Sequence, residues 1–213
     1  MVRKMCSPDP MSDLQAYQSR MRHSPQFQRF NVEPLWTPGE RDIEGFIHDE
    51  VVRQFHDPRV QDGKSRISWM LEAWYYARSY AHRPPTVYLT ERLGALVEPW
   101  QNERGFRAEA VWIGNREAPK AYFIPQLLKA LFALAPTIKP VQGITVNNER
   151  YTLGDFEEQV RDIKTADDFY LAYEWIHPFR DGNGRTGKIL HNWLLGALDD
   201  PVLVHDYFGG WNP

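Results

Sequence analysis

The sequence predicts a mainly α-helical protein with one β-hairpin, because two residue patterns follow one another along it. Several segments repeat apolar residues at the i, i+3, i+4 and i+7 positions, which lie on one face of a helix. One segment near the middle instead has two β-prone runs on either side of a short turn, which is the pattern of a hairpin. With 213 residues, 42% of them hydrophobic, the chain is long enough to form one domain with its own core.

Three helices are expected in the first half of the chain, over residues 39–58, 65–81 and 86–100. Ser65 is placed to cap the second helix. The apolar stripes of the first two helices are Ile43, Phe46, Ile47 and Val51, and Ile67, Met70, Leu71 and Trp74. Each stripe can pack its helix against a neighbour.

The predicted hairpin covers residues 105–125, with Gly114-Asn115-Arg116-Glu117 as its turn. A helix is expected over residues 125–136, where proline occupies a first-turn position that tolerates it. Residues 136–151 show no periodicity and predict a loop.

Two more helices are expected over residues 165–176 and 185–198. Thr165 and Asp168 have the spacing of a capping box at the start of the first of these helices. The apolar positions are Phe169, Ala172, Tyr173 and Ile176, and Ile189, Leu190, Trp193 and Leu194. The glycine-rich segment between them therefore joins two helices.

Composition limits the function classes. The net charge of −3 provides no basic field for nucleic acid or an acidic membrane. The single cysteine, Cys6, allows no disulfide within the chain, and no apolar run has the length of a membrane span. We expect an N-terminal arm over residues 1–36, a catalytic domain over residues 37–213, and a cytoplasmic location.

The glycine-rich segment, HPFRDGNGRTGK at residues 177–188, suggests three kinds of phosphate site. The three glycines fit a dinucleotide-binding loop, with Asp206 as the later acid, but such a loop must follow a strand. A P-loop needs the same preceding strand, and it needs a Ser or Thr at the position of Ile189.

Elsewhere in the chain, histidine-aspartate pairs occur at 48–49, 56–57 and 205–206. Their spacing is not convincing for the metal site of a phosphohydrolase.

The third possibility is an anion cradle, which needs only a glycine turn leading into a helix N-terminus. Arg185 lies in the first turn of that helix, where a polyphosphate would sit. Asp181 can hold Mg²⁺, which often takes one or two carboxylates together with phosphate oxygens. His177, just before the cradle, can take a proton from a nucleophile.

The same segment resembles the signature of the Fic (Fido) family, His-Pro-Phe-x-Asp/Glu-Gly-Asn-Gly-Arg-x-x-Arg, at every fixed position except the last, where Lys188 stands. The resemblance implies a Fic-type helical bundle with a hairpin flap that aligns the target. It also implies transfer of AMP from ATP to a Tyr, Thr or Ser hydroxyl of a target protein, or of the protein itself.

By this resemblance, His177 is the general base and Asp181 the Mg²⁺ ligand. By the same resemblance, Arg185 binds the outer phosphates of ATP. Lys188 would bind the γ-phosphate less firmly than an arginine, whose planar guanidinium can bind it with two hydrogen bonds. The remaining nucleotide-binding positions of the motif are Gly182, Asn183 and Gly184. Lys188 can also be read as a merely solvated residue.

Residues 40–45, ERDIEG, resemble the end of the inhibitory Ser/Thr-x-x-x-Glu-Gly/Asn helix that many Fic proteins carry. The resemblance makes Glu44 the inhibitory residue, although Glu40 stands where Ser or Thr is usual. Two other functions stay open. The chain can be a hydrolase that removes AMP, or a weakly catalytic binding module of a toxin–antitoxin pair.

Overall fold

The computed structural model describes residues 43–55, 61–113, 116–143 and 151–204. The chain divides into two units, residues 1–39 and 40–213, and every described residue belongs to the second. The expected N-terminal arm over residues 1–36 lies outside the described residues, as do Cys6, Asp206 and the predicted turn residues Gly114 and Asn115.

The described part of the chain is mostly helical, which confirms the predicted fold class. Its helices are α3 (Ile43–Phe55), α4 (Gln61–Ser79), α5 (Val87–Val97), α6 (Ile124–Phe132), α7 (Phe156–Gln159), α8 (Ala166–Ile176) and α9 (Asn183–Leu195). Short 3₁₀ turns cover Ala121–Phe123, Ala135–Thr137 and Val160–Asp162. Strands β1 (Trp112–Ile113) and β2 (Arg116–Glu117) form the two-stranded antiparallel hairpin.

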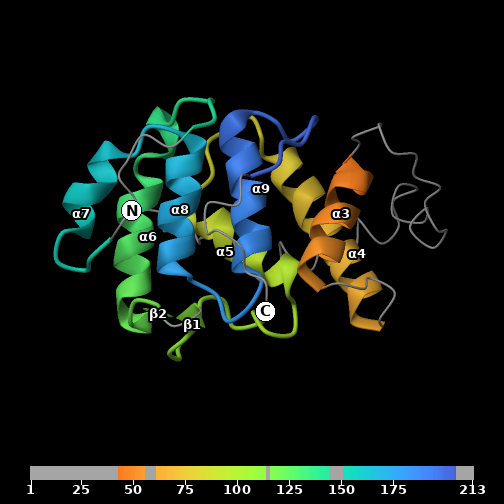
Figure 1. Ribbon diagram of the computed structural model, residues 1–213, viewed down its shortest axis with the longest axis horizontal. Helices are drawn as coiled ribbons and strands as arrows, with labels where there is room; N and C mark the ends of the chain where they lie inside the picture. The colour runs from red at the N-terminus through yellow and green to blue at the C-terminus, as the bar shows by residue number, and fades with distance from the viewer. Residues whose placement is uncertain (1–42, 56–60, 114–115, 144–150, 205–213) are drawn as a thin grey trace, which may run out of the picture. The chain divides into compact units, whose positions relative to one another are not determined.

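Helix α9 lies at the centre of the bundle and packs against α8, α5 and α4 (Figure 1). Helix α8 packs in turn on α6, and α3 packs on α4. The predicted stripes face this core: Ile47, Val51, Phe169 and Ile176 are fully buried. The hairpin lies at the end of the bundle where α8 finishes and α9 begins (Figure 1).

Local signals placed some helix ends correctly. The Thr165 hydroxyl accepts from the N–H of Asp168, whose carboxylate accepts from the N–H of Thr165, so the predicted capping box of α8 is confirmed. Helix α6 carries proline in its first turn, also as predicted. Helix α9 ends at Leu195, before the predicted end at residue 198, because Gly196 adopts the left-handed conformation typical of a helix C-terminus.

Other boundaries differ from the predictions. Helix α4 begins at Gln61, so Ser65 lies inside the helix and does not cap it. The first turns of α4 are polar, and apolar periodicity detects only the part of a helix that packs on a core. Residues 116–117 form strand β2 instead of the turn, and the short helix α7 was not predicted at all.

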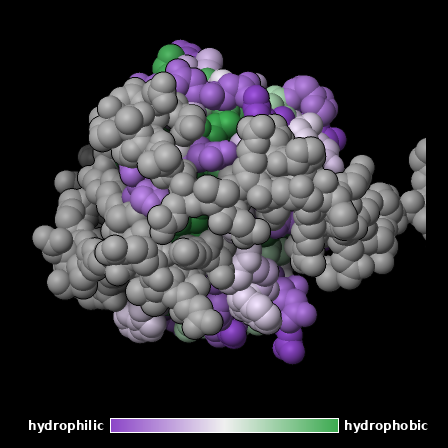
Figure 2. All heavy atoms as spheres, turned by 90° about the vertical axis from the view of Figure 1, so that its right-hand side faces the viewer, coloured by the Kyte–Doolittle hydropathy of each residue, from purple (hydrophilic) through white to green (hydrophobic). Residues whose placement is uncertain are grey.

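The described surface on the α3–α4 side is mostly hydrophilic, with small apolar areas between (Figure 2). None of the helices that the structure describes is long and apolar enough to cross a membrane.

Candidate active site

The segment from His177 to Gly182 turns the chain from the end of α8 into the start of α9. His177 ends α8 in the left-handed conformation, with φ 51° and ψ 63°, and its N–H donates to the carbonyl of Tyr173. Gly182 precedes α9 with φ 76°. A side chain at Gly182 would also collide with Val97, since its Cβ would lie 2.9 Å from Cγ1. Glycine is therefore required here for both backbone and space.

Phe179 anchors the turn in the core. Its ring is fully buried and lies against Gly94 of α5, where an added Cβ would come within 2.1 Å of it. The amide of Asn183 closes the turn, because it accepts from the N–H of Phe179 at 2.8 Å and donates to its carbonyl at 2.9 Å. The side chain of Asn183, expected in the nucleotide site, thus holds the loop's own backbone in this structure.

Arg107 is a residue that the sequence analysis missed. Its buried guanidinium donates to the carbonyls of His177 at 2.7 Å, Pro119 at 2.6 Å and Glu109 at 2.8 Å. It therefore ties the two sides of the flap to the turn that carries the histidine. No sequence signal distinguishes it, because arginines in irregular segments are usually solvated.

The ring of His177 is largely buried, and its Nδ1 lies 3.9 Å from Oε2 of Glu174, one turn earlier on α8. Burial lowers the pKa of His177 to about 4, with Arg107 and Arg116 as further lowering charges. Burial also raises the pKa of Glu174 to about 7, although Lys188 and Arg116 partly oppose this rise. Neutral imidazole is the form that can accept a proton.

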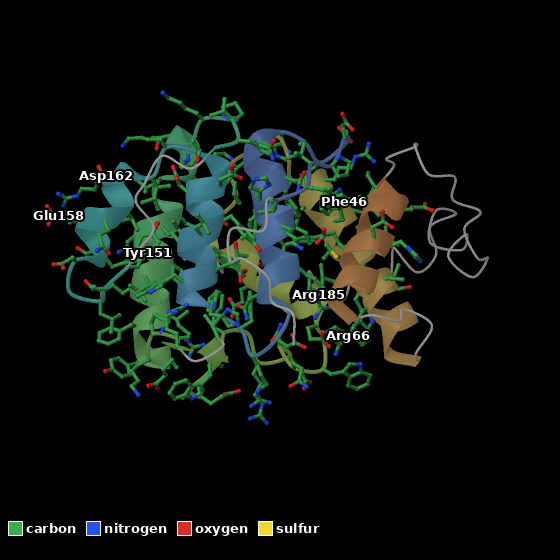
Figure 3. All side chains as sticks on the ribbon, viewed as in Figure 1. Phe46, Arg66, Tyr151, Glu158, Asp162 and Arg185 are labelled. Atoms are coloured by element: carbon green, nitrogen blue, oxygen red, sulfur yellow. The ribbon has the colours of Figure 1, made fainter. Side chains whose placement is uncertain are left out.

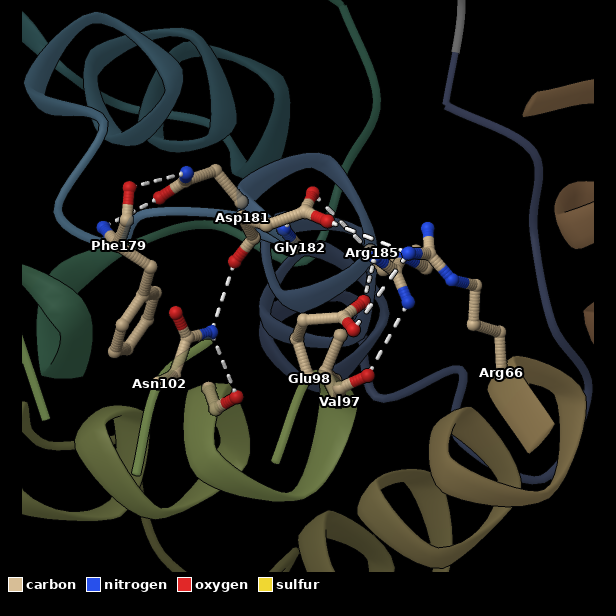
Figure 4. Close-up of polar contacts among 10 residues, drawn as sticks. Arg66, Val97, Glu98, Asn102, Phe179, Asp181, Gly182 and Arg185 are labelled. Carbon is tan, nitrogen blue, oxygen red and sulfur yellow. Dashed lines mark hydrogen bonds and ion pairs between the residues drawn. The ribbon is translucent and has the colours of Figure 1, made fainter. Parts of the chain in front are cut away.

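Asp181 lies at the mouth of the turn between two guanidinium groups. Its carboxylate is 3.6 Å from Arg185 and 3.8 Å from Arg66 of α4 (Figure 4). One carboxylate oxygen also accepts from the N–H of Gly182 at 2.6 Å. Asn102, which the sequence analysis did not single out, donates to the Asp181 carbonyl at 2.8 Å and so fixes the backbone here.

Arg185 has a side chain that is only 1% exposed. Its guanidinium is 2.7 Å from Glu98 and donates to the carbonyl of Val97 at 3.2 Å, as Figure 4 shows. In Figure 3, Arg185 and Arg66 come together from α9 and α4. In this arrangement Arg185 joins α9 to α5, and its contact with the outer phosphates stays a prediction.

The first turn of α9 provides open space for an anion. The first N–H groups of a helix have no acceptor within the helix. A Cβ added at Gly184 would meet no heavy atom within 4 Å. The same test at Gly187 finds Tyr170 at 2.8 Å and Glu174 at 3.0 Å. The free volume therefore lies over Gly184, where the sequence analysis placed the phosphates.

Lys188 is not simply solvated, because its ammonium group forms an ion pair with Glu50 of α3. Glu50 is buried, and Lys188 is largely so. The carboxylate that reaches Lys188 in this structure thus belongs to Glu50, whereas Glu44 lies six residues earlier in the first turn of α3. The inhibitory role of Glu44 stays a prediction.

Comparison with known proteins agrees with this geometry. Residues 116–195 match the model of the Fic/DOC family. This segment of the chain is therefore similar to a Fic domain. The chain is also 27% identical over 153 residues to a probable protein adenylyltransferase of Aquifex aeolicus, which covers 69% of this chain and 42% of the relative. The match thus spans less than half of that relative's length.

A second similarity is short: 45 residues are 40% identical to a ribonucleoside-diphosphate reductase small chain of Ostreid herpesvirus 1, covering 21% of this chain and 8% of that protein. The Fic-family match contains the whole of α8 and α9 with the turn between them. Glu50, Arg66, Glu98 and Arg107, which contact this turn or α9, precede the matched residues.

Proposed function

We propose that this protein is an adenylyltransferase that moves AMP from ATP to a hydroxyl side chain of a target protein. The observation that carries the proposal is the turn from α8 to α9, where a largely buried neutral histidine stands before an open helix N-terminus. The Fic/DOC match and the relative named as a probable protein adenylyltransferase support the same chemistry.

In this proposal His177 takes the proton of the target hydroxyl through Nε2. The hydroxyl oxygen forms a bond to the α-phosphorus, the bond between that phosphorus and the α,β-bridging oxygen breaks, and pyrophosphate leaves. The N–H groups at the start of α9 bind phosphate oxygens over Gly184. The buried contacts of Phe179, Asn183 and Arg107 keep this turn rigid, so His177 needs little reorganisation before proton transfer.

Asp181 fits a Mg²⁺ ion that is shared with phosphate. Its carboxylate is partly exposed and is the one acidic group in the turn. Among the described residues no three His, Cys, Asp or Glu side chains gather as a metal site. This suits Mg²⁺, which commonly binds one or two carboxylates plus substrate oxygens. When bound, the ion would neutralise phosphate charge, while Arg66 and Arg185 hold the carboxylate in place.

We further propose that Glu50 restrains the enzyme through Lys188. A γ-phosphate and the Glu50 carboxylate would compete for the same ammonium group. Lysine lacks the two-pronged fork of arginine, so this restraint should be weaker than a glutamate–arginine pair.

The test uses the purified protein with Mg²⁺ and ATP labelled on either the α- or the γ-phosphate, with lysate proteins as acceptors. We expect label from α-labelled ATP on protein and none from γ-labelled ATP. The His177→Ala variant should lose about 10²–10⁴-fold in rate while it keeps its fold. Release of AMP from a modified protein would instead identify a hydrolase, and nucleotide binding without turnover would identify a binding module.

A further inference from the structure

Glu174 lies beside His177 but has no place in the mechanism described above. It is three residues before His177 and shares its side of α8. We propose that the Glu174 carboxylate is a positioning residue, which holds His177 in the tautomer that keeps its proton on Nδ1 and leaves Nε2 free. This inference rests on the proposed function, because it assigns Glu174 through the role of His177 as base.

Two unsatisfied polar atoms carry the argument. Nδ1 of His177 and Oε1 of Glu174 are both buried, and neither has a hydrogen-bond partner among the residues that the structure describes. The shortest approach between the two groups is 3.9 Å, from Nδ1 to Oε2. Buried polar atoms are normally paired, and catalytic hydrogen bonds are often long before substrate binds. A small movement of either side chain would bring Oε2 within hydrogen-bond distance of Nδ1 and so satisfy the buried nitrogen.

Burial raises the pKa of Glu174 to about 7, and the charges of Lys188 and Arg116 oppose this rise. Toward His177, the Arg107 and Arg116 charges lower the pKa of the ring and Asp181 raises it. Two cations near an imidazole oppose its protonation, so a carboxylate at Nδ1 would offset them when the ring becomes charged.

The backbone offers a competing acceptor for the His177 ring. The carbonyl of Glu174 also lies near the ring and raises the pKa of His177. Its usual helical donor would be the N–H of residue 178, which is proline and has none. If this carbonyl alone orients the ring, the Glu174 carboxylate is not needed for that role. The Glu174→Gln substitution therefore distinguishes orientation by the carbonyl from orientation by the carboxylate.

During the reaction the proton of the hydroxyl passes to Nε2, and the Nδ1 proton stays on the ring. Glu174 accepts a hydrogen bond from Nδ1 and stabilises the imidazolium, as the aspartate of a Ser-His-Asp triad does, and it takes no proton itself. When the proton leaves Nε2 again, the neutral tautomer is restored.

The decisive variant is Glu174→Gln, which keeps the shape of the side chain and removes its charge. Glu158→Gln is the matched control, because Glu158 is exposed at the outer edge of α7 (Figure 3). Ring nitrogen chemical shifts, assigned to His177 with the His177→Ala variant, report tautomer and pKa without any need for turnover. We expect Glu174→Gln to lower the Nδ1–H fraction severalfold and to lower the pKa of His177, and Glu158→Gln to change neither.

In the labelling assay, Glu174→Gln should lower kcat by at least about tenfold, with the roughly 10⁴-fold loss of a triad amide variant as the upper limit. The KM for ATP should not change. An unchanged tautomer together with a kcat within twofold of wild type would overturn the inference and favour the backbone carbonyl. Absence of AMP transfer by wild type would overturn the proposed function, while the nitrogen shifts would still decide whether Glu174 orients the ring.

Discussion

At the residue scale, side chains from outside the motif determine what the motif residues do. Arg185 belongs to the motif, yet Glu98 and the carbonyl of Val97 hold its guanidinium in the interior. Asp181 is held from two sides by Arg66 and Arg185. Each of these motif residues therefore has contacts within the fold as well as a proposed role in the chemistry. A substitution tests both roles together.

Arg185→Ala should destabilise the fold as well as affect nucleotide binding. Among the described residues it would leave the buried Glu98 with the more distant Arg66, at 3.7 Å, as its charged partner. Breaking a buried ion pair from one side costs on the order of 3 kcal/mol of unfolding free energy. Urea denaturation would measure this cost.

The control is Arg180→Ala, which removes an exposed ion pair with Glu109. It should change the unfolding free energy much less, because exposed pairs contribute little. An unfolding free energy of Arg185→Ala equal to that of wild type would show that Arg185 does not stabilise the fold. It would then favour the role of Arg185 in binding phosphate.

At the element scale, the contacts of α9 with α5 and α3 shape the two sides of the candidate site. Gly94 of α5 makes room for Phe179, and α3 brings Glu50 to Lys188. The first contact fixes the turn, and the second occupies a cation that the nucleotide is proposed to need. The two helices can therefore be tested separately.

Gly94→Ala and Gly184→Ala should have opposite effects. An added methyl at Gly94 would overlap the Phe179 ring, and such overpacking typically costs about 1–3 kcal/mol of stability. At Gly184 the methyl would meet open space, and alanine in a helix is favoured over glycine by up to about 1 kcal/mol. Thermal unfolding would measure both.

The methyl at Gly184 should nevertheless weaken ATP binding, because it enters the volume proposed for the phosphates. Calorimetric titration with ATP and Mg²⁺ would detect this loss in a variant as stable as wild type. Unchanged ATP affinity in Gly184→Ala would place the phosphates elsewhere.

Glu50→Gln should raise AMP transfer, since it removes the anion that competes for Lys188. Glu44→Gly tests the original assignment in the same assay of self-labelling and target labelling at equal protein concentration. A gain in Glu50→Gln alone assigns the restraint to Glu50, and a gain in Glu44→Gly alone assigns it to Glu44. If neither variant gains activity, α3 does not restrain the site.

At the scale of the whole molecule, buried polar pairs connect the helices on either side of the site. His191 of α9 lies 2.6 Å from Asp167 of α8, and both are fully buried. The same Asp167 accepts from the N–H of Gly143, which ties the segment before α8 to this pair. No sequence pattern indicated this buried contact between α8 and α9.

Glu174 and His177 should contribute opposite pH dependences of stability. The pKa of Glu174 is raised to about 7 in the folded state, so its contribution is present at low pH and is lost as pH rises toward 7. The pKa of His177 is lowered to about 4, so its contribution is present above about pH 6.5 and is lost as pH falls toward 4. Each contribution is on the order of 3 kcal/mol, and in wild type they largely cancel.

Single variants should uncover each contribution between about pH 4 and 7. As pH rises, the unfolding free energy of Glu174→Gln should increase relative to that of wild type. That of His177→Ala should decrease relative to wild type over the same range. Urea denaturation at several pH values would measure both differences. Parallel curves for all three proteins would mean that neither group titrates abnormally in the folded state.

The helical fold class, the hairpin and the glycine-rich motif can be predicted from the sequence alone, because these features depend on local patterns. Apolar periodicity marks a helix wherever it packs on a core, and the capping box at Thr165 fixes a boundary through neighbours three residues apart. The glycines between two predicted helices likewise predict an anion cradle at residues 182–184.

Only the tertiary structure decided which side chains meet in the site. Glu50 lies 138 residues from Lys188, and Arg107 lies 70 residues from the His177 carbonyl that it binds. Contacts at such separations leave no period or spacing in the sequence, since they depend on how the helices pack. The same packing buried Arg185, and the loss of hydration on burial is the physical reason that its partner Glu98 must accompany it.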